Sequence, residues 1–197
     1  MRIKNLFVFI PLCVLFIVIF TYDTAVEDID ECPQAASQDA KPDELPVGDT
    51  FSIVAIDPVT GEVGGAGASC VDISTTYRRG VTFLSDIILN DSGEILGAIH
   101  TQAAYRESNQ NNARTRMLAG DTPQEIITWL NNNDTGSGSA QDRQYGVVDL
   151  IGGPGNTPRS AGFTGSTNSD YKNHIVGPNY AIQGNIILNQ DVLDEIG

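Results

Sequence analysis

The segment that most constrains the fold is residues 50–70, TFSIVAIDPVTGEVGGAGASC. Its first half carries the β-branched and apolar side chains that favour a buried strand. The DPVTG sequence at 57–61 predicts a tight turn, because Pro fixes φ and Gly adopts the positive φ that closes a hairpin. The returning half is rich in Gly and Ala, which cost stability in a strand. They indicate either close approach of another layer or a ligand, or a core strand of small residues.

The length and charge of the chain limit its class. Its 197 residues are enough for one domain with a sizeable core. Lys and Arg number 11 against 25 Asp and Glu, a net charge of −14. This balance argues against nucleic acid or an anionic membrane surface as a partner.

The N-terminus predicts export. Arg2 and Lys4 precede an apolar run over residues 6–20, which is the pattern of a secretory signal. The run is short for a membrane span of about 20 residues, and no A-x-A-like cleavage site follows it. Residues 1–21 are therefore predicted as a signal peptide or an uncleaved signal-anchor. The protein is expected to be secreted, periplasmic or membrane-anchored, with membrane contact only through residues 3–20.

Residues 22–49 form a second compositional unit. They are acidic, rich in Pro, Ala, Ser and Gln, and nearly free of large apolar residues, which predicts a disordered linker. In an oxidising compartment Cys32 could pair with Cys70. Cys70 could equally pair elsewhere or remain a small buried hydrophobe.

Two helices are predicted in the middle of the chain. Ser108 or Asn109 begins the first, which runs to Ala119 and is closed by Gly120. The TPQE sequence at 122–125 predicts the start of the second, because it combines a capping box with Pro at the first helical position.

Strands are predicted on both sides of these helices. The NDSG sequence at 90–93 indicates the turn of a second hairpin. The strand segments are 81–85, 87–89, 94–101, 144–151, 159–164 and 180–188, and residues 168–179 are predicted as a long polar loop.

Five motifs in order carry a resemblance to a known family. They are TFSIVAIDPVTGEVGGAGAS at 50–69, AIHTQA at 98–103, QYGVVD at 144–149, AGFTG at 161–165 and NYAIQGNI at 179–186. With them the chain resembles, from residue 50 to its end, the bacterial and archaeal family catalogued as domain of unknown function 1028. No activity is established for that family.

The resemblance implies a fold. The family is similar to the N-terminal-nucleophile (Ntn) hydrolases, so the expected fold is α+β, an α/β/β/α four-layer sandwich with two mixed sheets between helical layers. The expected domain is 50–197. Because the family usually continues with more helix and further strands, this domain is expected to be incomplete at the C-terminus.

Thr50 is the candidate nucleophile that the resemblance implies. In an Ntn hydrolase, proteolysis exposes a Thr, Ser or Cys at the chain start, and its α-amine acts as the base. A free α-amino group has a pKa of about 7.7–8.0, so it accepts the hydroxyl proton near neutral pH. Thr50 has this role only if the bond to Asp49 is cut. The alternative is that Thr50 merely begins a strand.

Other polar residues complete the predicted site. Ser69, Gln102 and Asn185 are candidate oxyanion or positioning groups, and with Thr50 they form the predicted catalytic set. Each has a purely structural alternative. A lone histidine such as His100 is often a core residue whose hydrogen bonds are satisfied, and the amide side chains of residues 179–185 could bridge loop backbone. The predicted substrate-binding residues are His100, Thr101, Asn179, Tyr180 and Gln183.

No cofactor or metal is expected, since two distant His residues and no Cys-x-x-Cys give no metal-ligand pattern. The predicted function is hydrolysis of an amide bond in a small-molecule or peptide-like substrate, and family members with a peptidoglycan-binding segment hint at cell-wall material. The alternative is a non-catalytic exported domain that binds a ligand or a partner on the same fold.

Overall fold

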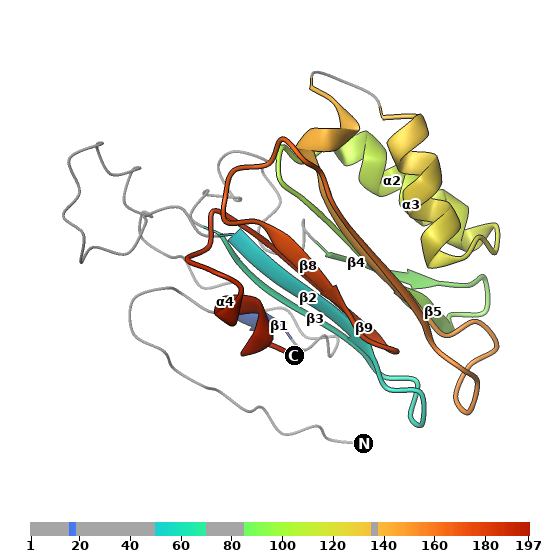
Figure 1. The fold of residues 1–197 in the computed structure, drawn as a ribbon. Helices are drawn as coiled ribbons and strands as arrows, with labels where there is room; N and C mark the ends of the chain where they lie inside the picture. The colour runs from blue at the N-terminus through green and yellow to red at the C-terminus, as the bar shows by residue number, and fades with distance from the viewer. Residues whose placement is uncertain (1–15, 19–49, 70–84, 135–137) are drawn as a thin grey trace, which may run out of the picture.

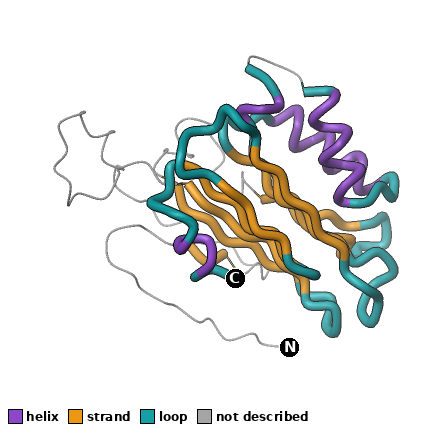
Figure 2. Tube along the Cα trace, viewed as in Figure 1, coloured by secondary structure: helices purple, strands orange, loops and turns teal. Residues whose placement is uncertain are grey.

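The computed structural model describes residues 16–18, 50–69, 85–134 and 138–197. They form two sheets that face each other, and the two longer helices lie over the outer face of one sheet (Figure 1). The fold is therefore α+β, as predicted. Figure 2 shows the same arrangement, with these helices together on one side of the strands.

Sheet A contains the predicted first hairpin. Its strand order is β1 (Phe16–Val18), β3 (Val63–Ser69), β2 (Thr50–Ile56), β9 (Tyr180–Asn185) and β8 (Asn173–Val176). The turn between β2 and β3 uses Gly61 at φ 74°, as the DPVTG sequence predicted. The central strand β2 places Thr50 opposite Ser69 on β3 and opposite Asn185 on β9.

Sheet B contains the second predicted hairpin. Its strand order is β4 (Ser85–Leu89), β5 (Ile95–Gln102), β6 (Gln144–Asp149) and β7 (Arg159–Thr164). All described strand pairs in both sheets are antiparallel, so the prediction of mixed sheets is wrong. The reason is that the helical connection from β5 to β6 brings the chain back to the end where it left, pairing Gln102 with Gln144.

The helices are α2 (Glu107–Leu118), α3 (Pro123–Asn132) and α4 (Asp191–Asp194), with a 3₁₀ turn η2 (Ala140–Asp142). The capping box of α3 is confirmed, with the Thr122 side chain accepting from the Glu125 backbone. The predicted start of α2 at Ser108 or Asn109 is wrong, because Asn109 lies inside the helix and donates to Asp134 and to the Tyr145 hydroxyl.

Two described strands were not predicted: β1, within the predicted export segment, and β8. The predicted loop over residues 168–179 contains β8, which pairs with β9 in the register Asn173 to Gly184. Its NHIV sequence is short and begins with polar residues, so it lacks the alternating apolar pattern by which a strand is recognised. It lies at the edge of sheet A, where pairing with one neighbour is sufficient.

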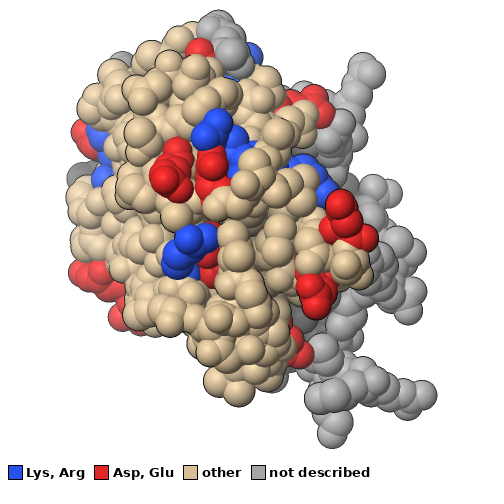
Figure 3. Space-filling view, turned by 90° about the vertical axis from the view of Figure 1, so that its right-hand side faces the viewer, with Lys and Arg blue, Asp and Glu red and all other residues tan. Residues whose placement is uncertain are grey.

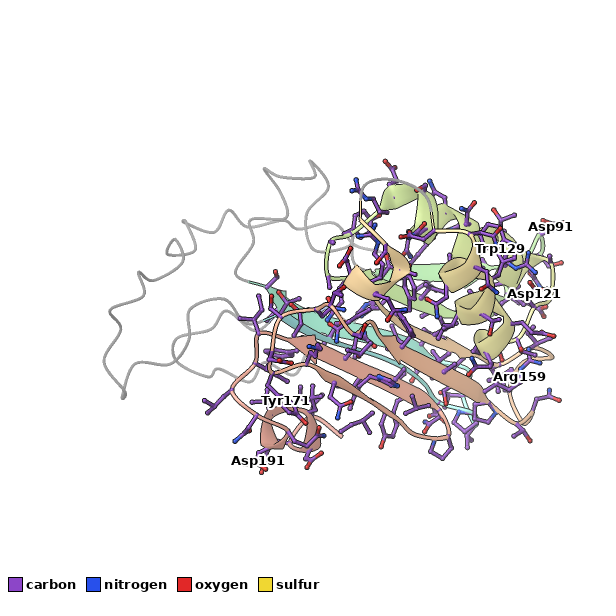
Figure 4. The ribbon with its side chains drawn as sticks, turned by 45° about the horizontal axis from the view of Figure 1, so that its top comes forward. Asp91, Asp121, Trp129, Arg159, Tyr171 and Asp191 are labelled. Carbon is purple, nitrogen blue, oxygen red and sulfur yellow. The ribbon has the colours of Figure 1, made fainter. Side chains whose placement is uncertain are left out.

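Three apolar clusters hold the layers together. Helices α2 and α3 pack Met117 and Ile127 against Tyr145 and other residues of sheet B. Val54 and Ala98 belong to the cluster between the two sheets. A third cluster packs Leu193 of α4 on the outer face of sheet A. In Figure 4, Trp129 and Asp121 mark the helical side of the molecule, and Tyr171 and Asp191 mark the α4 side.

Most of the predicted export segment lies outside the described residues, and so do the linker 22–49, Cys32 and Cys70. Within residues 1–21 the structure describes only β1, at the edge of sheet A beside β3. In the part of the chain that the structure describes, no helix is long and apolar enough to cross a membrane. The domain boundaries at 21 and 49 stay predictions.

Candidate functional site

The space between the sheets is apolar at one end and polar at the other. Alternate residues of β2 face this space, and along it Thr50 and Ser52 give way to Val54 and Ile56. The same change occurs on the other strands. We call the polar end the polar half, and its described inward-facing side chains are Thr50, Ser52, Ser69, His100, Gln102, Gln144, Thr164, His174, Gln183 and Asn185.

Three of the four predicted catalytic residues meet at the ends of neighbouring strands. Thr50 begins β2, Ser69 ends β3 and Asn185 ends β9. Thr50 Oγ1 lies 3.0 Å from Ser69 Oγ, and Asn185 is the partner of Thr50 across β9. Thr50 is 9% exposed, so its hydroxyl lies at the edge of the polar half rather than deep within it.

The fourth residue, Gln102, comes from sheet B and joins this group through Gln144. Gln102 Nε2 donates to Gln144 Oε1 at 2.8 Å, and Asn185 Nδ2 donates to the same oxygen at 2.7 Å. Gln144 Nε2 donates to the backbone oxygen of Gly184 at 2.7 Å and to Thr164 Oγ1 at 3.0 Å. The buried Gln144 carboxamide is therefore fixed on both sides and links the two sheets.

Ser52 makes a second link between the sheets. It is the next inward-facing residue of β2 after Thr50, so this link lies one residue pair closer to the apolar end. Its hydroxyl donates to Gln102 Oε1 at 2.6 Å and accepts from Gln183 Nε2 at 2.5 Å. Ser52 and Gln183 are both almost fully buried. The amide side chains of the polar half thus form one continuous hydrogen-bond network from Asn185 to Gln183.

His100 also lies in the polar half and is 2% exposed. Neither of its ring nitrogens has a hydrogen-bond partner among the described residues. Burial lowers the pKa of His100 to about 3, so the ring is neutral at physiological pH. His174, the other histidine, lies 3.0 Å through Nδ1 from Thr164 Oγ1, and burial lowers its pKa as well.

Left-handed backbone follows two of the site residues. Ala103 and Ala104 have φ of 53° and 40° directly after Gln102, and Ile186 has φ of 57° directly after Asn185. Such conformations are uncommon for residues with a side chain and persist where the surrounding structure holds them. Arg143 Nη1 donates to the Ala104 backbone oxygen at 2.7 Å, which holds the segment after Gln102.

Three predicted substrate-binding residues lie outside the polar half. Thr101 faces the helices, where its hydroxyl donates to Gln110 Oε1 at 2.7 Å. Asn179 precedes β9 at the apolar end and donates to the Ile56 backbone oxygen at 2.8 Å. Tyr180 packs in the cluster on the outer face of sheet A. The structure brings only His100 and Gln183 of this predicted set to the site.

Sequence reasoning missed four residues of the polar half: Ser52, Gln144, Thr164 and His174. Ser52 was within reach, because it lies two residues after Thr50 on a predicted strand and so shares its face. Gln144 opens the QYGVVD motif, but its role depends on two partners from distant strands. Thr164 and His174 carry no local signal of this kind.

The charged side chains that the structure describes lie outside the polar half. Asp149 pairs with Arg159 at 2.8 Å, and Asp86 pairs with Arg114 at 2.6 Å, both on the helical side of sheet B. The face in Figure 3 shows Lys and Arg beside Asp and Glu rather than a broad patch of one charge. Among the described residues no group of His, Cys, Asp or Glu could hold a metal ion.

Comparisons with known proteins place the chain in a family. It is similar to the crystal structure of SPO2555 from Silicibacter pomeroyi, a DUF1028 protein, with a TM-score of 0.53 and 26% sequence identity. The similarity covers 74% of this chain and 58% of SPO2555, so the chain spans less than two thirds of that protein. The comparison with curated proteins found no match. The model of the family of unknown function DUF1028 matches residues 50–197, and the chain therefore belongs to this family.

Proposed function

We propose that this protein is an exported amide-bond hydrolase of the Ntn type, with Thr50 as the nucleophile once the bond to Asp49 is cut. The observation that carries the proposal is the arrangement around Thr50. Its hydroxyl begins a central strand, lies 3.0 Å from Ser69 Oγ, and is opposite Asn185. The match to the family also begins at this residue.

The chemistry follows from a free Thr50. Its α-amine would accept the proton of Oγ1 as this oxygen attacks the carbonyl carbon of the substrate amide. The protonated α-amine would then give that proton to the leaving nitrogen, so that the C–N bond breaks, an ester forms on Thr50 and the amine is released. Water would then hydrolyse the ester and regenerate Thr50. Ser69 Oγ is within reach of the oxyanion formed beside Thr50 Oγ1, so we assign Ser69 the role of oxyanion donor.

Gln102 and Asn185 have a different role in this proposal. Both donate to Gln144 Oε1, and the Gln144 carboxamide is held by its own donor contacts to Gly184 and Thr164. Since these donors are already engaged, we assign Gln102 and Asn185 as positioning residues that fix the strand ends around Thr50 rather than as groups that contact the oxyanion.

The proposal includes the Ntn-like four-layer sandwich. Its support is the layer order, with α2 and α3 outside sheet B and α4 outside sheet A. The proposed substrate is a small-molecule or peptide-like amide, and cell-wall material is the candidate source for an exported enzyme. The N-terminal sequence supports export, through a signal that is either removed or kept as an anchor.

Two observations favour a second function, a non-catalytic exported domain that binds a ligand or partner. The amides of Gln102, Gln144 and Asn185 satisfy one another, as in a structural network, and Thr50 is joined to Asp49 in the printed chain. A chain that keeps residue 49 has no α-amine base at Thr50.

The deciding experiment is intact mass and N-terminal sequencing of the protein from its native host. A chain that begins Thr50-Phe51-Ser52 supports the hydrolase. Thr50→Ala should then abolish release of amine from a panel of acylated amides, and Thr50→Ser should retain it. Thr60→Ala, in the exposed turn, is the matched control. A mature chain that begins upstream of Thr50 would refute the mechanism and leave the binding domain.

A further inference from the structure

Three buried polar atoms in the polar half have no hydrogen-bond partner among the described residues. They are Nδ1 and Nε2 of His100 and Oε1 of Gln183. His100 is 2% exposed and Gln183 is fully buried. A buried polar group without a partner costs roughly 1–3 kcal/mol, so three such atoms in one place indicate a site that a polar group completes.

The two side chains come from opposite sheets and are related through Gly146. His100 on β5 is paired with Gly146 on β6, and paired residues of antiparallel strands point to the same face with Cβ positions about 4.5–5.5 Å apart. A Cβ on Gly146 would lie 2.1 Å from Gln183 Oε1. The Gln183 carboxamide therefore occupies the place of the missing side chain of Gly146, the strand partner of His100.

The hydrogen-bonding capacity of this pair is defined. Burial lowers the pKa of His100 to about 3, and a neutral imidazole offers one N–H donor and one nitrogen acceptor. Gln183 Oε1 adds a second acceptor. The unused set is two acceptors and one donor, which is the complement of a carboxamide, with its two N–H donors and one carbonyl acceptor.

The described strands offer no counter-charge to a charged ligand group. No inward-facing position of the described strands carries Asp, Glu, Lys or Arg. A carboxylate or ammonium group bound there would lose its hydration without gaining a counter-charge, which costs far more than burial of a neutral amide.

We propose that His100 and Gln183 form a recognition site for an uncharged carboxamide group. The site lies next to Thr50 on the side of the apolar end. Thr50 pairs with Asn185, and two residues further along the same two strands Ser52 pairs with Gln183. If the bound carboxamide is part of the substrate, this site rests on the proposed function. The substrate of the hydrolase would then be an amide that carries an uncharged carboxamide side group. Binding itself requires neither Thr50 nor chain cleavage.

The test uses the full chain labelled with ¹⁵N-histidine, because only two histidines contribute signals. The probes are propionamide, propionate and propylammonium, which share a carbon skeleton and differ in charge. We expect propionamide to shift the ring nitrogens of His100 in a saturable titration, and to bind at least about tenfold more tightly than either charged probe. The His174→Asn variant assigns the two sets of signals.

Variants test the residues. Gln183→Leu should abolish the His100 shift, whereas Gln124→Leu, at an exposed helix position, should leave it unchanged. Thr50→Ala should bind propionamide normally, so the outcome is separate from that of the hydrolase proposal. Equal binding of propionate, or no shift of His100 by any probe, would overturn the carboxamide site. The comparison of probes on the unmodified chain decides even if Gln183→Leu does not fold.

Discussion

Gln102 and Asn185, on opposite sheets and far apart in the sequence, donate to a single oxygen, Oε1 of Gln144, at 2.8 and 2.7 Å. Three strand ends are joined at that atom. The sequence predicted Gln102 and Asn185 as members of one site, and the structure brings them together through a residue that was not predicted.

Gln144→Leu should destabilise the protein strongly. It leaves the buried donors of Gln102 and Asn185 without their acceptor and removes the donor to the Gly184 backbone. At roughly 1–3 kcal/mol for each unsatisfied buried group, we expect a loss of about 3 kcal/mol or more in the free energy of unfolding, measured by urea denaturation. Gln124→Leu is the exposed control. A loss below about 0.5 kcal/mol for Gln144→Leu would show that the network contributes little.

His100 should make the protein sensitive to acid. Burial lowers its pKa in the folded state from 6.5 to about 3, so between these values the unfolded chain binds a proton that the folded chain does not. The stabilising effect of the neutral ring is complete above pH 6.5 and is lost as the pH falls towards 3. Relative to His100→Gln, the wild type should lose about 1 kcal/mol of stability per pH unit in this range. Parallel curves for the two proteins would contradict this.

The buried ion pair of Arg143 and Asp134 should be intolerant of a single substitution. Arg143 is 1% exposed and Asp134 8%, and their N–O distance is 3.2 Å. Arg143→Met leaves a buried carboxylate without its cation and the Ala104 backbone oxygen without its donor, so we expect a loss of roughly 3–5 kcal/mol on urea unfolding. The pair of Lys172 and Asp170, in which the Asp170 side chain is 81% exposed, is the control, and Asp170→Asn should cost at most about 1 kcal/mol.

The capping box of α3 offers a local test. Thr122→Ala removes the oxygen that accepts from the Glu125 backbone and should lower the free energy of unfolding by about 1 kcal/mol. Thr128→Ala, at an exposed position inside the same helix, should be neutral or slightly stabilising, because Ala has the higher helix propensity. Equal losses for both variants would mean that capping does not stabilise this helix.

Local sequence was sufficient to predict the tight turns and the start of α3. The turns at 57–61 and 90–93 and the start of α3 were predicted correctly, because Pro, Gly and the capping residues determine backbone conformation within a few positions. The start of α2 was not, because Asn109 makes its hydrogen bonds to Asp134 and Tyr145 rather than to the first turn. A tertiary contact there overrides a local preference.

The residues of the candidate site also include some that were predicted correctly and one that was not. Thr50, Ser69, Gln102 and Asn185 were predicted from motif positions at strand ends, and the structure brings them to one end of the space between the sheets. Thr101 was grouped with its neighbours in the motif but faces the helices. Because successive strand residues point to opposite faces, adjacency in a motif does not give adjacency in a site.

The sequence by itself determined the family, the two hairpins and the polar residues at the strand ends, because these depend on local conformation and on motifs read along the chain. Only the tertiary structure decided that Gln144 joins the sheets, that β8 completes sheet A and that the Gln183 carboxamide fills the space over Gly146, the strand partner of His100. The physical reason is that these relationships require residues from distant strands to face the same interior. Which residues face that interior together is determined by the strand register and by the packing of the two sheets, and it cannot be deduced from any single segment.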